Sequence, residues 1–301
     1  MTSLEAIAVP RLQVIETFRN YLSLTKPRVI VLLLITTVPA MMVAQRGWPS
    51  SWLVIATLIG GSLSAGGANA INCWYDRDID GIMRRTRGRP LVTGAIEPAR
   101  GLAFGIALGL GGFAWLWATA TLMAAALSLA ALLFYVFVYT IWLKRRTPQN
   151  IVIGGAAGAF PPMVGWAAVT GDVSLASLTM FAIIFMWTPP HFWALSLRLK
   201  DDYAEAGVPM LPVARGPAAT RTQILVYSLA LVVVTLALVP AADIGWIYAG
   251  TSVFLGAGFV RSAFRLWRHP AEVPPMRLYK YSLLYLALLF VAMGVDAVVL
   301  S

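Results

Sequence analysis

Long apolar blocks recur along the whole chain, and they limit most strongly what it can fold into. The 301-residue sequence is 59% hydrophobic and 12% charged, whereas an ordinary soluble domain is about a quarter charged. Each block has about 20 residues, the length that a helix needs to cross the hydrocarbon core of a bilayer. Blocks so long and uniform do not suit the strands of a membrane barrel. The sequence therefore predicts an all-α, polytopic membrane protein whose helices form one bundle.

We expect about nine transmembrane helices in a single transmembrane domain, residues 29–301, preceded by a cytoplasmic tail, residues 1–28. The predicted spans are 29–45, 52–71, 101–118, 121–142, 151–170, 175–197, 222–241, 244–260 and 281–300. In this arrangement every Lys and Arg except Arg46 lies on the side of the N-terminus. Because cytoplasmic loops are rich in Lys and Arg, we expect a cell inner membrane protein with its N-terminus and longer loops in the cytoplasm and its C-terminus outside. The net charge of +10 thus sets topology and indicates no nucleic-acid partner.

An acidic and then basic stretch, NCWYDRDIDGIMRRTRGRPL (72–91), follows the second predicted span. Asn72, Asp76 and Asp80 are four residues apart, so on a helix they share one face. Carboxylates one turn apart repel each other unless a cation lies between them. Four basic residues that suit a phosphate oxyanion come next: Arg84, Arg85, Arg87 and Arg89. The stretch predicts a metal–diphosphate site, and the alternative is a solvated mixed-charge loop at the membrane surface.

A second acidic cluster follows the sixth predicted span. Asp201 and Glu205 are one helical turn apart, Asp202 is adjacent, and Lys200 precedes them. Both clusters face the same side of the membrane, so together they could hold Mg²⁺ ions that bridge the oxygens of a diphosphate. The rest of such a substrate must suit an intramembrane cavity, which indicates a hydrocarbon chain. Departure of a metal-bound diphosphate from an allylic chain in a dry cavity is the chemistry of prenyl transfer.

Three further features have both a functional and a structural explanation. Lys26 and Arg28 lie at the mouth of the first span, as part of an anion site or as anchors at the membrane surface. Pro161 and Pro162 should break the fifth span inside the membrane, beside a cavity or as a packing kink. His191 lies near the end of the sixth span, where a histidine is either functional or a hydrogen-bonded structural residue.

Five segments together resemble the UbiA-type intramembrane prenyltransferases, and within them the protohaem IX farnesyltransferase family. They are LTKPRV (24–29), NCWYDRDIDGIMRRTRGRPLVTG (72–94), TPQNIVIGGAAGAFPPMVGW (147–166), TPPHFWALSL (188–197) and DYAEAGVPMLPV (202–213). The resemblance implies transfer of a farnesyl group from farnesyl diphosphate to a vinyl group of haem b, with water addition, giving haem O and diphosphate. It also implies Mg²⁺ as cofactor, the lipid bilayer as surroundings, and a downstream haem-modifying enzyme or terminal oxidase assembly as partner.

The resemblance and the residue patterns above together assign roles to residues. The catalytic positions are Asn72, Asp76, Asp80 and Asp202. The metal ligands are drawn from both acidic clusters: Asp76, Asp80, Asp201, Asp202 and Glu205. The residues expected at the substrates are Lys26, Arg28, Arg84, Arg87, Arg89, Lys144, Arg145, His191, Lys200 and Tyr203. The second cluster departs from the family pattern of two aspartates four apart, because Ala206 stands four residues after Asp202. Which of its carboxylates binds metal therefore stays open.

Two other functions remain possible on the sequence alone. A prenyltransferase for a quinone-type or chlorophyll-type acceptor would share the first acidic motif, and only the segments within 147–213 favour haem. A membrane carrier of amphipathic anions would also use broken helices and a basic cytoplasmic mouth. Such a carrier has no need of two acidic clusters with metal-ligand spacing on the same side.

Overall fold

The chain folds into one bundle of helices. The structure, a computed structural model, describes residues 3–299, with the side chains of residues 13–32 and 34–299. Over that part it contains helices and turns but no strand. The long helices are α1 Ser3–Leu24, α2 Pro27–Gln45, α3 Ser51–Tyr75, α6 Pro98–Thr119, α7 Leu122–Leu133 continued by the π-helix η1 Phe134–Leu143, α11 Leu175–Arg198, α14 Gly216–Ala242, α15 Trp246–Arg268 and α16 Pro275–Val299. The shorter helices are α4 Arg77–Ile82, α5 Pro90–Thr93, α8 Asn150–Gly154, α9 Ala156–Ala159, α10 Pro161–Thr170, α12 Lys200–Glu205 and α13 Leu211–Ala214.

The prediction of about nine membrane helices is confirmed. Within residues 3–299, eight segments are long and apolar enough to cross a membrane. The ninth helix is α15, which packs against α14 and α16. It is less apolar because its last turns carry Arg261, Arg265 and Arg268.

The fifth span is broken, as its prolines predict. Residues 150–170 form three helices, with α8 ending at Gly154, α9 ending at Ala159 and α10 beginning at Pro161. Proline at the start of a helix needs no hydrogen-bond partner for its nitrogen, so α10 begins there without loss. Non-helical backbone at membrane depth requires protein or a cavity beside it. The break in fact borders the cavity described below.

Glycines bring α3 and α6 into direct contact, as expected for small residues in a membrane bundle. A Cβ on Gly67 would lie 2.6 Å from the carbonyl oxygen of Gly105, and one on Gly112 would lie 2.8 Å from the amide nitrogen of Ser64. Both approaches are too close for any side chain. The contact fixes the position of α3, whose C-terminal end carries the first acidic motif.

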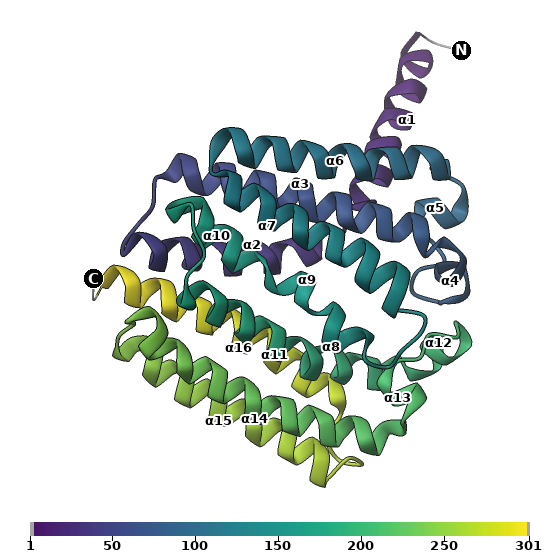
Figure 1. The fold of residues 1–301 in the computed structure, drawn as a ribbon. Helices are drawn as coiled ribbons and strands as arrows, with labels where there is room; N and C mark the ends of the chain where they lie inside the picture. Colours follow the sequence, from purple (N-terminus) through teal and green to yellow (C-terminus); the bar gives the residue numbers. More distant parts are fainter. Residues whose placement is uncertain (1–2, 300–301) are drawn as a thin grey trace.

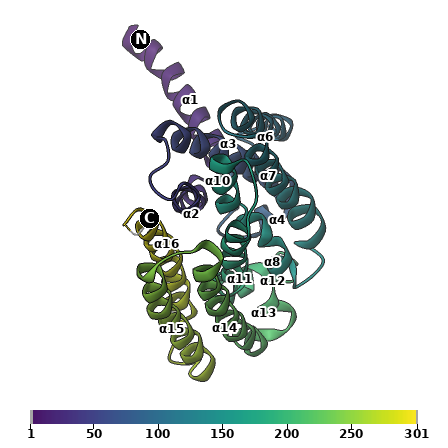
Figure 2. The same cartoon turned by 60° about the vertical axis from the view of Figure 1, so that its left-hand side comes forward.

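The short helices α4, α5, α12 and α13 gather at one end of the bundle, opposite the end where the C-terminus lies (Figure 1). The helix α1 projects away from the bundle, as both views show (Figures 1 and 2). One apolar core is built mainly by α11, α14, α15 and α16. A second core joins α2, α3, α6, α7 and α10. Several of the predicted site residues line a cavity between these two groups of helices.

Candidate functional site

The first acidic motif lies where α3 ends and α4 begins. The helical register continues through this junction, since the amide of Asp76 donates to the carbonyl of Asn72 (2.9 Å) and that of Asp80 to the carbonyl of Asp76 (2.8 Å). All three residues are buried, with exposed fractions of 3% or less. The predicted shared face is therefore present, although α3 ends one residue before Asp76.

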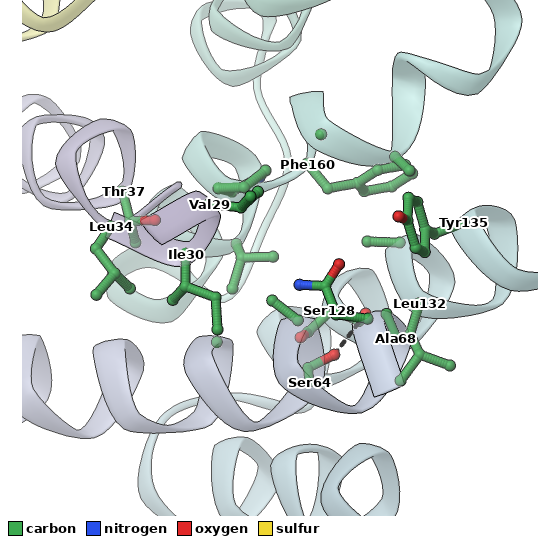
Figure 3. Close-up of a pocket in the computed structure, with 18 of the residues that line it drawn as sticks. Val29, Ile30, Leu34, Thr37, Ser64, Ala68, Ser128, Leu132, Tyr135 and Phe160 are labelled. Atoms are coloured by element: carbon green, nitrogen blue, oxygen red, sulfur yellow. Dashed lines mark hydrogen bonds between the residues drawn. The ribbon is translucent and has the colours of Figure 1, made fainter. Parts of the chain in front are cut away.

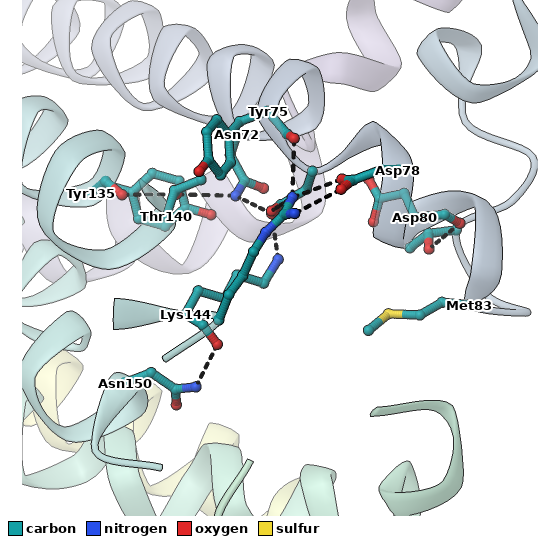
Figure 4. Close-up of polar contacts among 12 residues, drawn as sticks. Asn72, Tyr75, Asp78, Asp80, Met83, Tyr135, Thr140, Lys144 and Asn150 are labelled. Carbon is teal, nitrogen blue, oxygen red and sulfur yellow. Dashed lines mark hydrogen bonds and ion pairs between the residues drawn. The ribbon is translucent and has the colours of Figure 1, made fainter. Parts of the chain in front are cut away.

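Two cations that directly follow η1 surround Asp76. Its carboxylate is fully buried and forms an ion pair with Lys144, and Arg145 approaches it at 3.4 Å. The side-chain amide of Asn72 donates to the same carboxylate at 2.7 Å. Figure 4 shows this group of polar contacts. Because each carboxylate has its own protein cation, the repulsion between Asp76 and Asp80 is offset: Asp80 pairs with Arg89.

Two neighbouring groups hold these charges in place. Arg145 donates twice to Asp78, at 2.7 Å each. That hydrogen bond holds the pKa of the Asp78 carboxyl below its usual value. On the other side, the Lys26 ammonium donates to Asn72 Oδ1 at 2.8 Å. Burial lowers the pKa of Lys26 from 10.5 to about 8.

A π-helix places Tyr135, Tyr139 and Lys144 on the same wall. Lys144 is nine residues after Tyr135, so on an α-helix the two would point in roughly opposite directions. A π-helix has about 4.4 residues per turn, so nine residues make two turns and the side chains align. The wider turn is visible in the backbone i→i+5 hydrogen bond from Lys144 N to Tyr139 O at 2.8 Å. All three aligned side chains border the same cavity.

This cavity, of about 1640 Å³, opens among the charged residues. Its polar end is lined by Lys26, Asn72, Asp80, Arg85, Arg89 and Lys144. An apolar pocket of about 880 Å³ adjoins it, between α2, α3, α7, α9 and α10 (Figure 3). The two spaces share Val29, Asn69, Tyr135 and Gly158, so they lie side by side. The hydroxyls of Ser64 and Thr57 bond to backbone carbonyls, which leaves the pocket without free donors from these side chains.

An aromatic group from α11 and α16 forms another side of the cavity. The His191 ring stacks between Trp187 (4.1 Å between centroids) and Tyr279 (4.6 Å). His191 Nδ1 lies 2.7 Å from Ser282 Oγ, and that hydroxyl donates its proton to the carbonyl of Tyr279. Ser282 Oγ must then accept from Nδ1–H, so Nε2 carries the lone pair. An imidazole in this tautomer, on a cavity wall, can bind a metal or accept a hydrogen bond.

The second acidic cluster lies farther from the cavity. Asp201 and Glu205 are exposed, Asp202 is partly buried, and Glu205 forms an ion pair with Arg84 at 3.8 Å. None of these carboxylates lines the cavity. Over the part of the chain with described side chains, no three Asp, Glu, His or Cys residues come close enough to hold one ion. The metal role of this cluster stays a prediction.

The other predicted site residues either line the cavity or lie outside its lining. Tyr203 is buried and lines the cavity, where its hydroxyl accepts from Arg85 at 3.2 Å. Burial raises the pKa of this hydroxyl. Five of the residues expected at the substrates lie outside the cavity lining: Arg28, Arg84, Arg87, Arg145 and Lys200. The structure thus places seven predicted residues in the lining of one cavity: Lys26, Asn72, Asp80, Arg89, Lys144, His191 and Tyr203. Asp76 and Arg145 are linked to them by the ion pairs of Asp76 with Lys144 and Arg145.

Sequence reasoning did not identify the residues that shape this space. Tyr135, Tyr139 and Asn69 line it, and Ser282 orients His191. The interval of four and then five residues from Tyr135 through Tyr139 to Lys144 is a signal of a π-helix, although it is a weak one. Ser282 carried no signal, because it meets His191 only through the packing of α16 against α11.

Comparison with known proteins identifies the family that the chain resembles. Residues 33–291 match the UbiA prenyltransferase family. The chain is 53% identical to the protoheme IX farnesyltransferase of Clavibacter sepedonicus, over 92% of each chain. It is 57% identical to protoheme IX farnesyltransferase 1 of Saccharopolyspora erythraea, over 93% of this chain and 90% of that one.

Solved structures share its fold. One, from work on digeranylgeranylglyceryl phosphate synthase, has a TM-score of 0.78 at 17% identity and covers 94% of this chain and 99% of its own. Another is a UbiA homologue from Archaeoglobus fulgidus bound to DMAPP and Mg²⁺, with a TM-score of 0.66 at 19% identity, covering 92% of this chain and 99% of its own. At these identities the similarity establishes the shared fold.

Proposed function

Because the chain belongs to the UbiA prenyltransferase family, we propose that it transfers a farnesyl group from farnesyl diphosphate to a vinyl group of haem b. Water adds in the same reaction, and the products are haem O and diphosphate. Relatives with 53% and 57% identity over nearly their whole length are named protoheme IX farnesyltransferases. The observation that carries the proposal is a cavity with a cationic end and an aromatic side that bears an imidazole, next to an apolar pocket with which it shares four lining residues.

The cationic end suits the diphosphate. It is lined by three cations, Lys26, Arg89 and Lys144. Each of them contacts Asn72 or a carboxylate of the first motif. Phosphate oxygens are strong acceptors for such cations. Their charge stabilises the diphosphate as it leaves, which lowers the barrier to breaking the C–O bond.

The donor set at this end also fits Mg²⁺. The ion prefers one or two carboxylates, with substrate phosphates and water completing an octahedron. Asp80 lines the cavity and Asp76 lies one turn away, both buried, so these two would hold it with Asn72 beside them. Asp201, Asp202 and Glu205 are proposed as further ligands from the second loop. When bound, Mg²⁺ would neutralise charge on the leaving diphosphate. The A. fulgidus homologue bound to DMAPP and Mg²⁺ has this fold.

The apolar pocket suits the farnesyl chain, and the aromatic side suits haem. Tyr135 lines both the pocket and the cavity, so it would lie next to the carbon that reacts. Trp187 and Tyr279 present flat surfaces, and the Nε2 lone pair of His191 is available to haem iron. These positions would hold the vinyl group against the prenyl group.

The reaction balances without an oxidant. Diphosphate leaves with the electron pair of the C–O bond and an allylic cation remains. The terminal vinyl carbon attacks this cation, which forms a C–C bond and moves the positive charge to the carbon next to the porphyrin ring. Water adds there and loses a proton, which leaves a hydroxyl group. The apolar pocket keeps water from the first cation, while the open polar end admits it later.

The protein is a multi-pass membrane protein. We assign residues 29–301 to the transmembrane prenyltransferase domain and residues 1–28 to a cytoplasmic tail. The charge distribution supports cytoplasmic active-site loops and an outer C-terminus, in the inner membrane. Haem O is insoluble in water, so an enzyme that modifies it further, or a terminal oxidase assembly, is the expected partner.

The test is product formation by the purified protein with farnesyl diphosphate, haem b and Mg²⁺ in detergent. We expect a product with the mass of haem O, and none after Mg²⁺ is chelated. Quinone-type and chlorophyll-type acceptors should give no product under the same conditions. Binding or transport of farnesyl diphosphate with no covalent product would indicate a carrier instead.

A further inference from the structure

Gly61 borders the apolar pocket, and its missing side chain adds space to it. No atom lies within 4 Å of an ideal Cβ on Gly61. The preceding glycine behaves differently, because a Cβ on Gly60 would lie 2.5 Å from Leu116 Cγ. Helix packing therefore requires Gly60 to be small but makes no such demand on Gly61. The space beside Gly61 belongs to the pocket.

One face of α3 runs along the pocket from its open end to its closed end. The residues on this face are Thr57, Gly61, Ser64, Ala65, Ala68 and Asn69. Asn69 lies at the open end, because it lines both the pocket and the polar cavity. With a rise of 1.5 Å per residue, Gly61 lies about 12 Å and Thr57 about 18 Å farther in along the helix.

Packed side chains close the inner end. Thr57 is 1% exposed and Val164 is 5% exposed. Beyond them, Met41, Val54 and Leu116 form a buried apolar cluster with Val164. A chain that enters from Asn69 therefore has a limited depth, and the side chain at position 61 determines how much of that depth is open.

We propose that Gly61 sets the length of the prenyl chain that the enzyme accepts. The inference rests on the proposed function, which places the reacting carbon beside Asn69 and Tyr135. An extended farnesyl chain then spans roughly 13 Å, since extended chains advance about 3.5 Å per three bonds. Its last isoprene unit lies at Gly61. A geranyl chain is about 5 Å shorter and ends near Ser64 and Ala65.

The test is Gly61→Leu, assayed with haem b and each of geranyl, farnesyl and geranylgeranyl diphosphate. The leucine should lower kcat/KM for farnesyl diphosphate roughly 10- to 100-fold, because it overfills the occupied pocket. The value for geranyl diphosphate should stay within a few fold. Gly61→Ala is the milder variant, and it should reduce use of geranylgeranyl diphosphate before that of farnesyl diphosphate.

Gly111→Leu is the matched control. Gly111 is also a helical glycine with no atom within 4 Å of its ideal Cβ, but it is exposed on α6 and outside the pocket. Its chain-length preference should equal that of the wild type. Equal losses with geranyl and farnesyl diphosphate in well-folded Gly61→Leu, or no loss with either, would overturn the inference. A wild-type protein that makes no product from farnesyl diphosphate would refute the proposed function instead.

Discussion

Removal of the Asp76 carboxylate should damage both the stability and the activity of the protein, and the two effects can be separated. The Asp76 side chain is fully buried, and it faces Lys144 and Arg145, whose side chains are only 12% and 30% exposed. Asp76→Ala leaves these cations without that partner in a poorly hydrated place. Breaking a buried ion pair costs roughly 3–5 kcal/mol. We expect a clear fall in the midpoint of thermal unfolding in detergent.

Activity should fall for a different reason. The variant lacks a proposed metal ligand, and removal of one electrostatic stabiliser typically costs at least ~100-fold in rate. The double variant Asp76→Ala with Lys144→Met distinguishes the two causes. It removes both partners of the pair, so it should recover much of the stability but none of the rate. Asp78→Asn is the control, because Asp78 is 60% exposed and contacts Arg145 but not the cavity.

The assays are thermal unfolding of the purified variants and the rate of haem O formation under identical conditions. Asp78→Asn should lose much less activity than Asp76→Ala. If the double variant regains activity along with stability, Asp76 serves only to neutralise its neighbours. In that case the metal role assigned to it is wrong.

Three further predictions concern other parts of the account. Burial lowers the pKa of Lys26 to about 8, so its positive charge is present below pH 8 and lost above it. The affinity for farnesyl diphosphate should therefore fall as the pH rises from 7 to 9, by up to about tenfold per pH unit. Lys26→Arg should flatten the profile, and a flat wild-type profile would exclude this role. His191→Ala should weaken haem binding and shift its Soret band, and Ser282→Ala should do so to a lesser extent; unchanged spectra in both would make His191 structural. In a cysteine-free background, a cysteine at position 84 should resist an impermeant reagent added to intact cells and one within 171–174 should react; the reverse pattern would invert the topology.

The sequence predicted the architecture well because its signals were local. Apolar blocks of about 20 residues, the basic loops and Pro161 each act within their own segment. The spacing of Asn72, Asp76 and Asp80 also predicted a shared face, since one continuous helical register carries all three.

The rest depended on contacts between segments. Lys144 pairs with Asp76 because the π-helix changes the direction in which its side chain points, and π-helices have little sequence signature. The apolar pocket arises from small residues on α3 and α7 that could equally have been packed against other helices. Nor did the sequence distinguish Gly60, which packing requires, from Gly61, which borders empty space.

The most direct test of the central claim is the origin of the new oxygen in the product. The purified protein is supplied with farnesyl diphosphate, haem b and Mg²⁺ in ¹⁸O-enriched water, and the product is analysed by mass spectrometry. Attack of the vinyl carbon on a farnesyl cation, followed by water, predicts a farnesylated haem with one heavy oxygen in its hydroxyl group. A product without that oxygen, or one labelled only when ¹⁸O₂ is supplied, would contradict the mechanism.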